Sequence, residues 1–213
     1  MPTIPKLNID SIAGMKVLFL TNNPITSPLA EWFKYHAKED IILYSDKIAV
    51  SHLDTFSPDI IISYNYRHLI TKDVITLSNN KIINLHISFL PWNRGADPNL
   101  WSFIEDTPKG VTIHLIDKGI DTGDILLQTE LTFDEIRETL ESSYKTLHKE
   151  IQKLFIANWN KIREFQVPPE PQREKGTFHN SKESITIKNV FGQQLWHEPI
   201  YKLKQKLHDM ALI

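Results

Sequence analysis

The stretch Met-Lys-Val-Leu-Phe-Leu at residues 15–20 is a short apolar run that ends in the turn-forming sequence Thr-Asn-Asn-Pro at 21–24. A run of this length without polar alternation is typical of a strand buried on both faces of a sheet. Similar runs follow at residues 40–44, 59–63 and 81–86. Because helical stretches separate them, they predict an α/β fold, a Rossmann-like, mostly parallel twisted sheet with helices on both faces.

The remainder of the chain predicts further elements. A Pro-rich segment at 167–172 ends a long amphipathic helix and starts a linker. Beyond the linker, alternating apolar residues at 184–189 predict an edge or hairpin strand. We expect helices at 27–35, 99–106, 140–165 and 201–210, and additional strands at 110–117 and 124–133.

Composition limits what the chain can do. Its 213 residues suffice for one domain with a small appendage. The absence of cysteine excludes a disulfide scaffold, a thiolate metal site and a cysteine nucleophile. A net charge of −2 supplies no positive field to recruit nucleic acid or an anionic membrane. No apolar run approaches the roughly 20 residues that span a bilayer, and residues 1–14 lack a signal-peptide pattern. We therefore expect a soluble, cytoplasmic protein.

Three common nucleotide and hydrolase motifs are missing from the sequence. The first predicted strand is not followed by G-x-G-x-x-G, and G-x-x-x-x-G-K-[ST] does not occur. A nicotinamide or triphosphate site of the usual type is therefore not expected. The G-x-S-x-G elbow of α/β-hydrolases is also absent.

The densest polar cluster follows the predicted strand at 81–86. Asn84 and His86 are two residues apart, so strand geometry places their side chains on the same face. Because ligands bind beyond the carboxyl ends of parallel strands, we expect the segments 21–23, 63–67 and 84–88 to lie close together. A carboxamide beside an imidazole suits a reaction in which an oxyanion develops, since the amide donates hydrogen bonds and the imidazole exchanges protons near neutral pH.

A third polar element is Asp121, which lies between two glycines in the loop at 118–124. A carboxylate near His86 would raise the pKa of the imidazole and fix its tautomer. The residues alone leave other interpretations open. Asp121 can be a turn former, and His86 and His114 can be hydrogen-bonded structural residues. Together with Asp117, these three side chains can also be read as the ligands of a metal-dependent hydrolase.

Several ordered motifs resemble those of the 10-formyltetrahydrofolate-dependent formyltransferases. They are Asn84-x-His86-x-Ser88-x-Leu-Pro91, Arg94-Gly95, Gly110-Val-Thr-Ile-His114 and Gly119-Ile-Asp-Thr-Gly-Asp-Ile125. The stretch Leu-Pro-Trp-Asn-Arg-Gly-Ala-Asp-Pro-Asn-Leu-Trp at 90–101 is most similar to the branch that acts on nucleotide-linked amino sugars. The resemblance extends from about residue 15 to residue 172.

The resemblance implies the formyltransferase fold and a metal-free reaction in which the amine of a nucleotide-linked amino (dideoxy) sugar attacks the formyl group of 10-formyltetrahydrofolate. It implies that Asn84 and protonated His86 hold the oxyanion while Asp121 supports the imidazolium. It also implies a folate pocket that comprises Tyr66, Arg67, His68, Leu69, Lys118, Gly119 and Ile120. We assign the acceptor to four further side chains, those of Asn22, Asn23, Trp92 and Arg94.

The resemblance also sets expectations for the whole chain. They are an N-terminal arm (1–14), a formyltransferase catalytic domain (15–165), and a linker with a C-terminal extension (166–213). We expect no nucleic-acid or membrane partner and a role in lipopolysaccharide O-antigen biosynthesis. The predicted strand at 184–189 is a candidate interface of a homodimer, and the alternative is an edge strand that caps its own domain. Three alternatives remain: a methionyl-tRNA formyltransferase, which needs a further basic RNA-binding domain, a metal-dependent hydrolase, and a non-catalytic folate or nucleotide binder.

Overall fold

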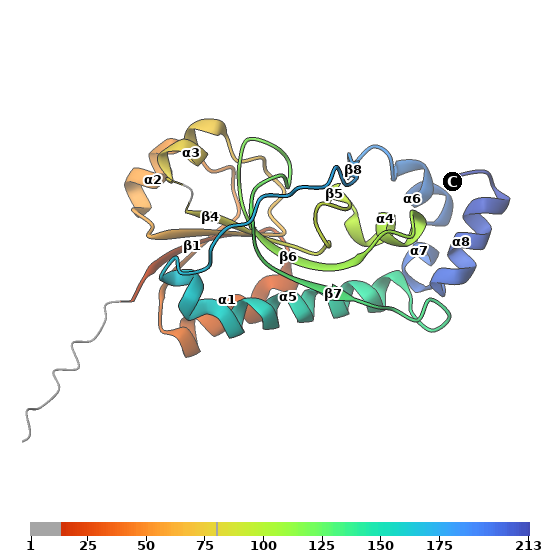
Figure 1. The fold of residues 1–213 in the computed structure, drawn as a ribbon, viewed down its shortest axis with the longest axis horizontal. Coiled ribbons are helices and arrows are strands. Elements are labelled where there is room, and N and C mark those ends of the chain that lie inside the picture. Colours follow the sequence, from red (N-terminus) through yellow and green to blue (C-terminus); the bar gives the residue numbers. More distant parts are fainter. Residues whose placement is uncertain (1–13, 80) are drawn as a thin grey trace, which may run out of the picture.

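The computed structural model describes residues 14–79 and 81–213, so the expected N-terminal arm lies outside the described residues except for Gly14. One six-stranded sheet organises the described chain, in the order β2-β1-β3-β4-β6-β7 (Figure 1). The first three pairings in this order are parallel and the last two antiparallel, which confirms a mostly parallel, Rossmann-like sheet. Its strands are β1 (Lys16–Leu20), β2 (Asp40–Tyr44), β3 (Ile60–Tyr64), β4 (Ile82–His86), β6 (Lys109–Leu115) and β7 (Ile125–Leu131).

A second, two-stranded sheet pairs β5 (Arg94–Gly95) with β8 (Phe178–His179), so that the chain after the Pro-rich segment at 167–172 runs back alongside the loop that follows β4. The helices of the described residues are η1 (Pro24–Thr26), α1 (Ser27–Trp32), η2 (Phe33–Ala37), α2 (Val50–Phe56), α3 (Lys72–Leu77), α4 (Pro98–Ile104), α5 (Leu140–Arg163), α6 (Ile185–Phe191), α7 (Gln194–His197) and α8 (Ile200–Asp209). Within the ranges 14–79 and 81–213, none of these helices is both long enough and apolar enough to cross a bilayer.

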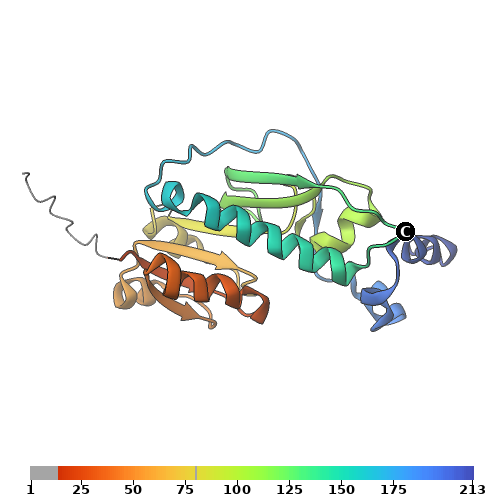
Figure 2. The same cartoon turned by 90° about the horizontal axis from the view of Figure 1, so that it is seen from below.

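Strand β1 supplies side chains to two separate cores, one on each face of the sheet. Val17 and Phe19 pack into the cluster formed with α1 and α5, whereas Leu18 and Leu20 pack into the cluster formed with α2 and α3. Figure 2 shows the long teal helix α5 lying along one face of the sheet, with α1 beside it. Both faces are therefore covered, and this explains why residues 15–20 show no polar alternation.

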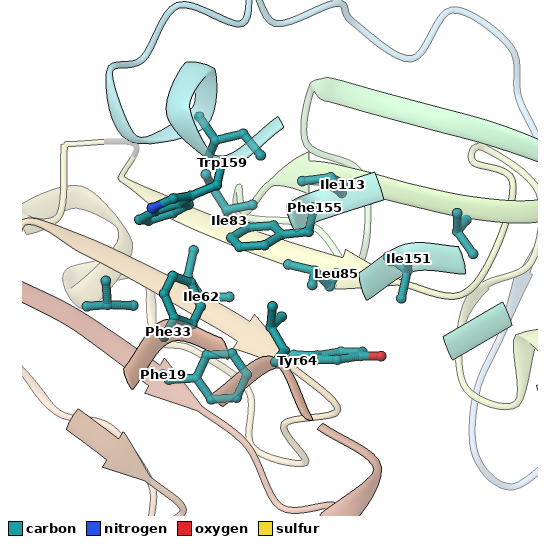
Figure 3. Close-up of a cluster of buried hydrophobic side chains, with 14 of the residues drawn as sticks. Phe19, Phe33, Ile62, Tyr64, Ile83, Leu85, Ile113, Ile151, Phe155 and Trp159 are labelled. Atoms are coloured by element: carbon teal, nitrogen blue, oxygen red, sulfur yellow. The ribbon is translucent and has the colours of Figure 1, made fainter. Parts of the chain in front are cut away.

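Aromatic side chains of α5 fill the larger core. Figure 3 shows Phe155 and Trp159 projecting from this helix toward the sheet, next to Phe33. The ring centroids of Phe33 and Phe155 are 5.6 Å apart at 67°, and those of Phe33 and Trp159 are 4.9 Å apart at 86°. Such edge-to-face contacts add specific attraction to the burial of apolar area. They join α5 to η2, and the same cluster contains Ile62 of β3 and Ile83 of β4, two strands with polar side chains at their carboxyl ends.

The predicted strand at 184–189 is wrong, because residues 185–191 form helix α6. Ile187, Phe191 and Leu195 recur every four residues, and all three are buried in one cluster with Leu203 of α8. The apolar alternation around Ile185 suggested a strand, but this side chain is 48% exposed and takes no part in that cluster. A homodimer built on strand pairing at 184–189 therefore loses its structural basis.

The terminal helix expected at 201–210 is confirmed by α8, which spans Ile200–Asp209. In Figure 1 the helices α6 and α8 lie at the end of the molecule opposite to α2 and α3. The cluster that holds them also contains Leu100, Trp101 and Phe103 of α4. The C-terminal extension is thus packed against α4, directly after the loop that follows β4.

We expect Phe155→Ala to lower the free energy of unfolding by about 3–5 kcal/mol, because it removes a fully buried ring and leaves a cavity in the core. Urea denaturation monitored by circular dichroism measures this value. The matched control is Leu43→Ala on the edge strand β2, where the side chain is 59% exposed. Its effect should stay within about 0.5 kcal/mol. Equal losses in both variants would contradict the placement of the core.

Candidate active site

A cleft of about 820 Å³ opens at the carboxyl ends of β3 and β4. Asn84, His86 and Asp121 all line it, although they come from two stretches of chain more than thirty residues apart. The remaining lining residues are Ser63, Asn65–Ile70, Leu85, Ile87, Gly95–Pro98, His114, Ile116–Ile120, Tyr144 and Phe178–Ser181. The structure therefore brings together the three side chains that the sequence analysis singled out.

The ends of the parallel strands converge as predicted. The N–H of Asn22 donates to the carbonyl of Asn65 at 3.2 Å, and the N–H of Arg67 donates to Asn22 Oδ1 at 3.0 Å. Ser63 lies directly opposite Asn84 in the β3–β4 register. This convergence follows from parallel pairing, which places the carboxyl ends of neighbouring strands at one edge of the sheet.

Asn84 projects toward the cleft because its neighbours Ile83 and Leu85 point into the core under α5. Its side-chain nitrogen lies 3.1 Å from His114 Nε2 and 3.3 Å from Asp121 Oδ1. The Nδ1 atom of His114 lies 2.8 Å from the carbonyl of Leu115, to which it donates a hydrogen bond. His114 is buried at a register shift between β6 and β7, which confirms that it is a hydrogen-bonded partner.

Asp121 is held at both its carboxylate and its backbone. Its Oδ2 accepts a hydrogen bond from the N–H of Gly95 at 2.8 Å and lies 3.8 Å from His86 Nε2. Its Oδ1 lies 3.6 Å from His114 Nε2. Burial by itself would raise the pKa of Asp121, but His86, His114 and the Gly95 N–H together lower it well below its ordinary value. The carboxylate is therefore ionised at neutral pH.

His86 behaves differently from the expectation that a nearby carboxylate would raise its pKa. Burial has the largest effect and lowers the pKa of His86 below its ordinary value, and the opposing effect of Asp121 does not compensate. The ring is therefore neutral near pH 7. Its Nε2 faces two acceptors, the Asn93 carbonyl at 3.4 Å and Asp121 Oδ2, so the neutral ring carries its proton on Nε2.

Chemically, the cluster combines an amide donor, a neutral imidazole and an ionised carboxylate in one buried place. This set can accept a proton, stabilise the resulting imidazolium and donate to an oxyanion. Asp117 does not join the cluster, because its carboxylate accepts hydrogen bonds from the Gly119 N–H and the Thr122 hydroxyl. Across the described part of the chain, no group of three or more histidine, aspartate or glutamate side chains is arranged to hold a metal ion.

The residues assigned to a folate pocket surround this cluster, since all seven line the cleft: Tyr66, Arg67, His68, Leu69, Lys118, Gly119 and Ile120. Leu69 is 72% exposed and Ile120 is 43% exposed, although both are large and apolar. Exposed apolar side chains that line a cleft are suited to contact a bound ligand. A folate-binding role for these residues stays a prediction.

The four side chains assigned to the acceptor take up other contacts and are not among the cleft-lining residues. The amide of Asn22 donates to the carbonyl of Ser45, and Asn23 caps η1 through Ile25. Arg94 Nη2 donates to the carbonyl of Lys175 at 2.8 Å and so ties down the linker. For Trp92 the contact is made by the backbone, since its carbonyl accepts a hydrogen bond from the Ser88 hydroxyl.

One side chain of the cleft was not found from the sequence, that of Tyr144, which reaches it from α5. Phe178 and His179 of the segment 176–179, which the sequence suggests closes over the acceptor site, reach the cleft from β8. The N–H of Gly95 contacts the Asp121 carboxylate through backbone alone, which no side-chain pattern reveals. A glycine is required there, because a Cβ atom on Gly95 would lie 2.3 Å from the carbonyl oxygen of His179 and φ is +88°. The Arg94-Gly95 motif was the available signal.

Comparisons with known proteins agree with this geometry. The formyl transferase family profile matches residues 22–158. The formyltransferase PseJ from Anoxybacillus kamchatkensis, solved in complex with UDP-4,6-dideoxy-4-formamido-L-AltNAc and tetrahydrofolate, is 40% identical. That match covers 88% of this chain and 97% of PseJ, with a TM-score of 0.80.

Among curated proteins, the methionyl-tRNA formyltransferase of Finegoldia magna is 30% identical over 185 residues, which are 79% of this chain and 60% of that protein. The methionyl-tRNA formyltransferase of Thermodesulfovibrio yellowstonii is 33% identical over 132 residues, 61% of this chain and 42% of that protein. The chain spans about half the length of the curated relatives it matches. The family profile covers more than half of the chain and PseJ is matched over nearly its whole length, so the chain belongs to the formyl transferase family of enzymes.

Proposed function

We propose that the chain transfers the formyl group of 10-formyltetrahydrofolate to the amino group of a nucleotide-linked amino sugar. The observation that carries this proposal is the cluster of Asn84, His86 and Asp121 in a cleft that the residues assigned to folate also line. The similarity to PseJ supports the acceptor class, because that structure holds both a formylated nucleotide sugar and tetrahydrofolate.

The reaction begins when the sugar amine attacks the formyl carbon. A carbon–nitrogen bond forms and the carbonyl oxygen becomes an oxyanion. Collapse of the tetrahedral intermediate breaks the bond between that carbon and N10 of the folate. The amine loses one proton and N10 gains one, so the products are a formamido sugar and tetrahydrofolate. Holding both reactants in one cleft removes much of the entropic cost of their encounter.

In this proposal the neutral His86 accepts the amine proton, directly or through a water molecule. Burial lowers the pKa of His86 and keeps the ring neutral beforehand. The imidazolium that results lies 3.8 Å from the carboxylate of Asp121, which stabilises it. The positive charge on His86 therefore forms at the same stage as the negative charge on the substrate oxygen, and the two opposite charges stabilise each other.

Asn84 supplies a hydrogen bond to the oxyanion. Both of its amide protons have acceptors within reach, at 3.1 Å in His114 and 3.3 Å in Asp121. Donation to the oxyanion therefore exchanges one of these partners for the substrate oxygen.

The acceptor sugar takes the part of the cleft that the folate assignment leaves free. Its lining there includes Tyr144 and the segments 95–98 and 178–181. Tyr144 packs edge-on against Trp196 of α7, with centroids 5.8 Å apart, so this part of the cleft borders the C-terminal helices. The expected homodimer, cytoplasmic location and role in O-antigen synthesis stay predictions.

Incubation of the purified chain with 10-formyltetrahydrofolate and a panel of nucleotide-linked 3- and 4-amino sugars tests the proposal. Mass spectrometry should detect a formylated product with at least one acceptor of the panel. Methionyl-tRNA serves as the competing acceptor, because the curated relatives carry that name. Formylation of methionyl-tRNA alone, or of nothing, would remove the amino-sugar proposal.

We expect His86→Ala to lower kcat by about 10²–10⁴-fold, because the variant lacks the group that exchanges protons with the substrate amine. The matched control is His208→Ala on α8, an exposed histidine that does not line the cleft. It should keep the wild-type rate. Steady-state kinetics and circular dichroism of both variants provide the measurement, and an unchanged rate in a folded His86→Ala would exclude His86 from the mechanism.

The pH dependence of kcat/KM should reflect the lowered pKa of His86. As the pH falls, the neutral imidazole persists to below pH 6.5, so the acidic limb should lie below that value. Asp121→Asn removes the charge that opposes the effect of burial, so this limb should move to still lower pH while kcat falls. The substrates titrate identically in both assays, and the difference therefore reports the enzyme. A limb that moved to higher pH in Asp121→Asn would contradict the assignment.

A further inference from the structure

We propose that Gln172 is a positioning residue for Asp121: a single side-chain amide from the linker holds the loop that carries the carboxylate. Gln172 Nε2 donates to the carbonyl of Asp121 at 2.9 Å and to the carbonyl of Gly123 at 2.8 Å. Both amide protons are therefore used on one loop. The inference rests on the proposed function to the extent that Asp121 acts on His86.

The linker presents this amide rigidly, because it is anchored on both sides of Gln172. Two residues earlier, Glu170 forms a pair of backbone hydrogen bonds with Ile125, at 2.8 and 2.9 Å. Three residues later, the carbonyl of Lys175 accepts a hydrogen bond from Arg94. Gln172 Oε1 is buried and has no hydrogen-bond partner within the described ranges, so all the hydrogen bonds of this side chain come from its Nε2.

The loop needs such an anchor because Asp121 has a φ of +53°, in the left-handed region that non-glycine residues seldom adopt. Gly123 is confined as well, since a Cβ atom there would lie 1.8 Å from the carbonyl oxygen of Leu115. The Gly95 N–H fixes the carboxylate end of Asp121, and Gln172 fixes its backbone end. The two contacts together determine where the carboxylate faces His86.

Both anchors depend on the same segment of chain. Gly95 belongs to β5, which pairs with β8 at the far end of the linker, and the N–H of Ala96 donates to the carbonyl of His179 at 2.8 Å. The linker thus supports the carboxylate through Gly95 and the backbone through Gln172. His86 itself faces Asp121, His114 and the Asn93 carbonyl, so a displaced carboxylate changes its surroundings directly.

Gln172→Met tests the inference, because methionine keeps the length of the side chain and removes both donors. We expect the pKa of His86, followed by NMR titration of the histidine rings, to fall by about half a pH unit or more as the carboxylate retreats. We expect kcat to fall by about 10- to 100-fold while the KM value for the amino-sugar acceptor changes by less than about twofold. Gln172→Asn, which retains the amide but is too short to reach both carbonyls, should change both readouts in the same direction.

The matched control is Gln152→Met. Gln152 also donates twice from one amide nitrogen, to the Ile25 carbonyl at 2.9 Å and the Tyr64 hydroxyl at 3.2 Å, but does not contact the Asp121 loop. It should leave the His86 titration unchanged. If Gln172→Met and Gln172→Asn both titrate like the control, the inference is overturned. The titration requires no turnover, so its outcome stands even if the chain proves to formylate no amino sugar.

Discussion

The candidate site depends on keeping one carboxylate ionised in a buried position. Burial alone would raise the pKa of Asp121, and a neutral acid there could not stabilise an imidazolium. The structure prevents this by surrounding the carboxylate with His86, His114 and the Gly95 N–H. His86 comes from β4, His114 from β6 and Gly95 from β5. The carboxylate of Asp121 therefore stays ionised only when all three strands are correctly placed.

Strand pairing in the main sheet sets the relative positions of the two histidines, and the apolar cores on its two faces stabilise the sheet. Parallel pairing aligns the ends of β1, β3 and β4, while the switch to antiparallel pairing brings His114 of β6 opposite Asn84. On the other face of the same strands, Phe155 and Trp159 of α5 share one core cluster with Ile62, Ile83 and Leu85. The polar side chains at the strand ends therefore rest on a rigid base, which is what a preorganised site requires.

The linker changes how the chain divides into parts. From its composition, the Pro-rich segment around residues 167–172 is a spacer. In the structure it returns to the catalytic loop and then pairs with β5, so it supports the site instead of separating it from the C-terminal helices. Arg94 illustrates the same point, because its guanidinium donates to the carbonyl of Lys175 in the linker.

From the sequence by itself came the alternation of buried strands and helices and the placing of Asn84 and His86 on one face, since both depend on local spacing. A role for Asp121 came from the resemblance to the formyltransferases. The sequence could not determine that α6 is a helix, because the apolar residues of 184–189 fit either period until Ile187, Phe191 and Leu195 find a common partner in α8. Nor could it determine the protonation of His86, which depends on how completely the folded chain removes water from the ring. Tertiary structure decided both, because burial and non-local contacts exist only once distant segments have come together.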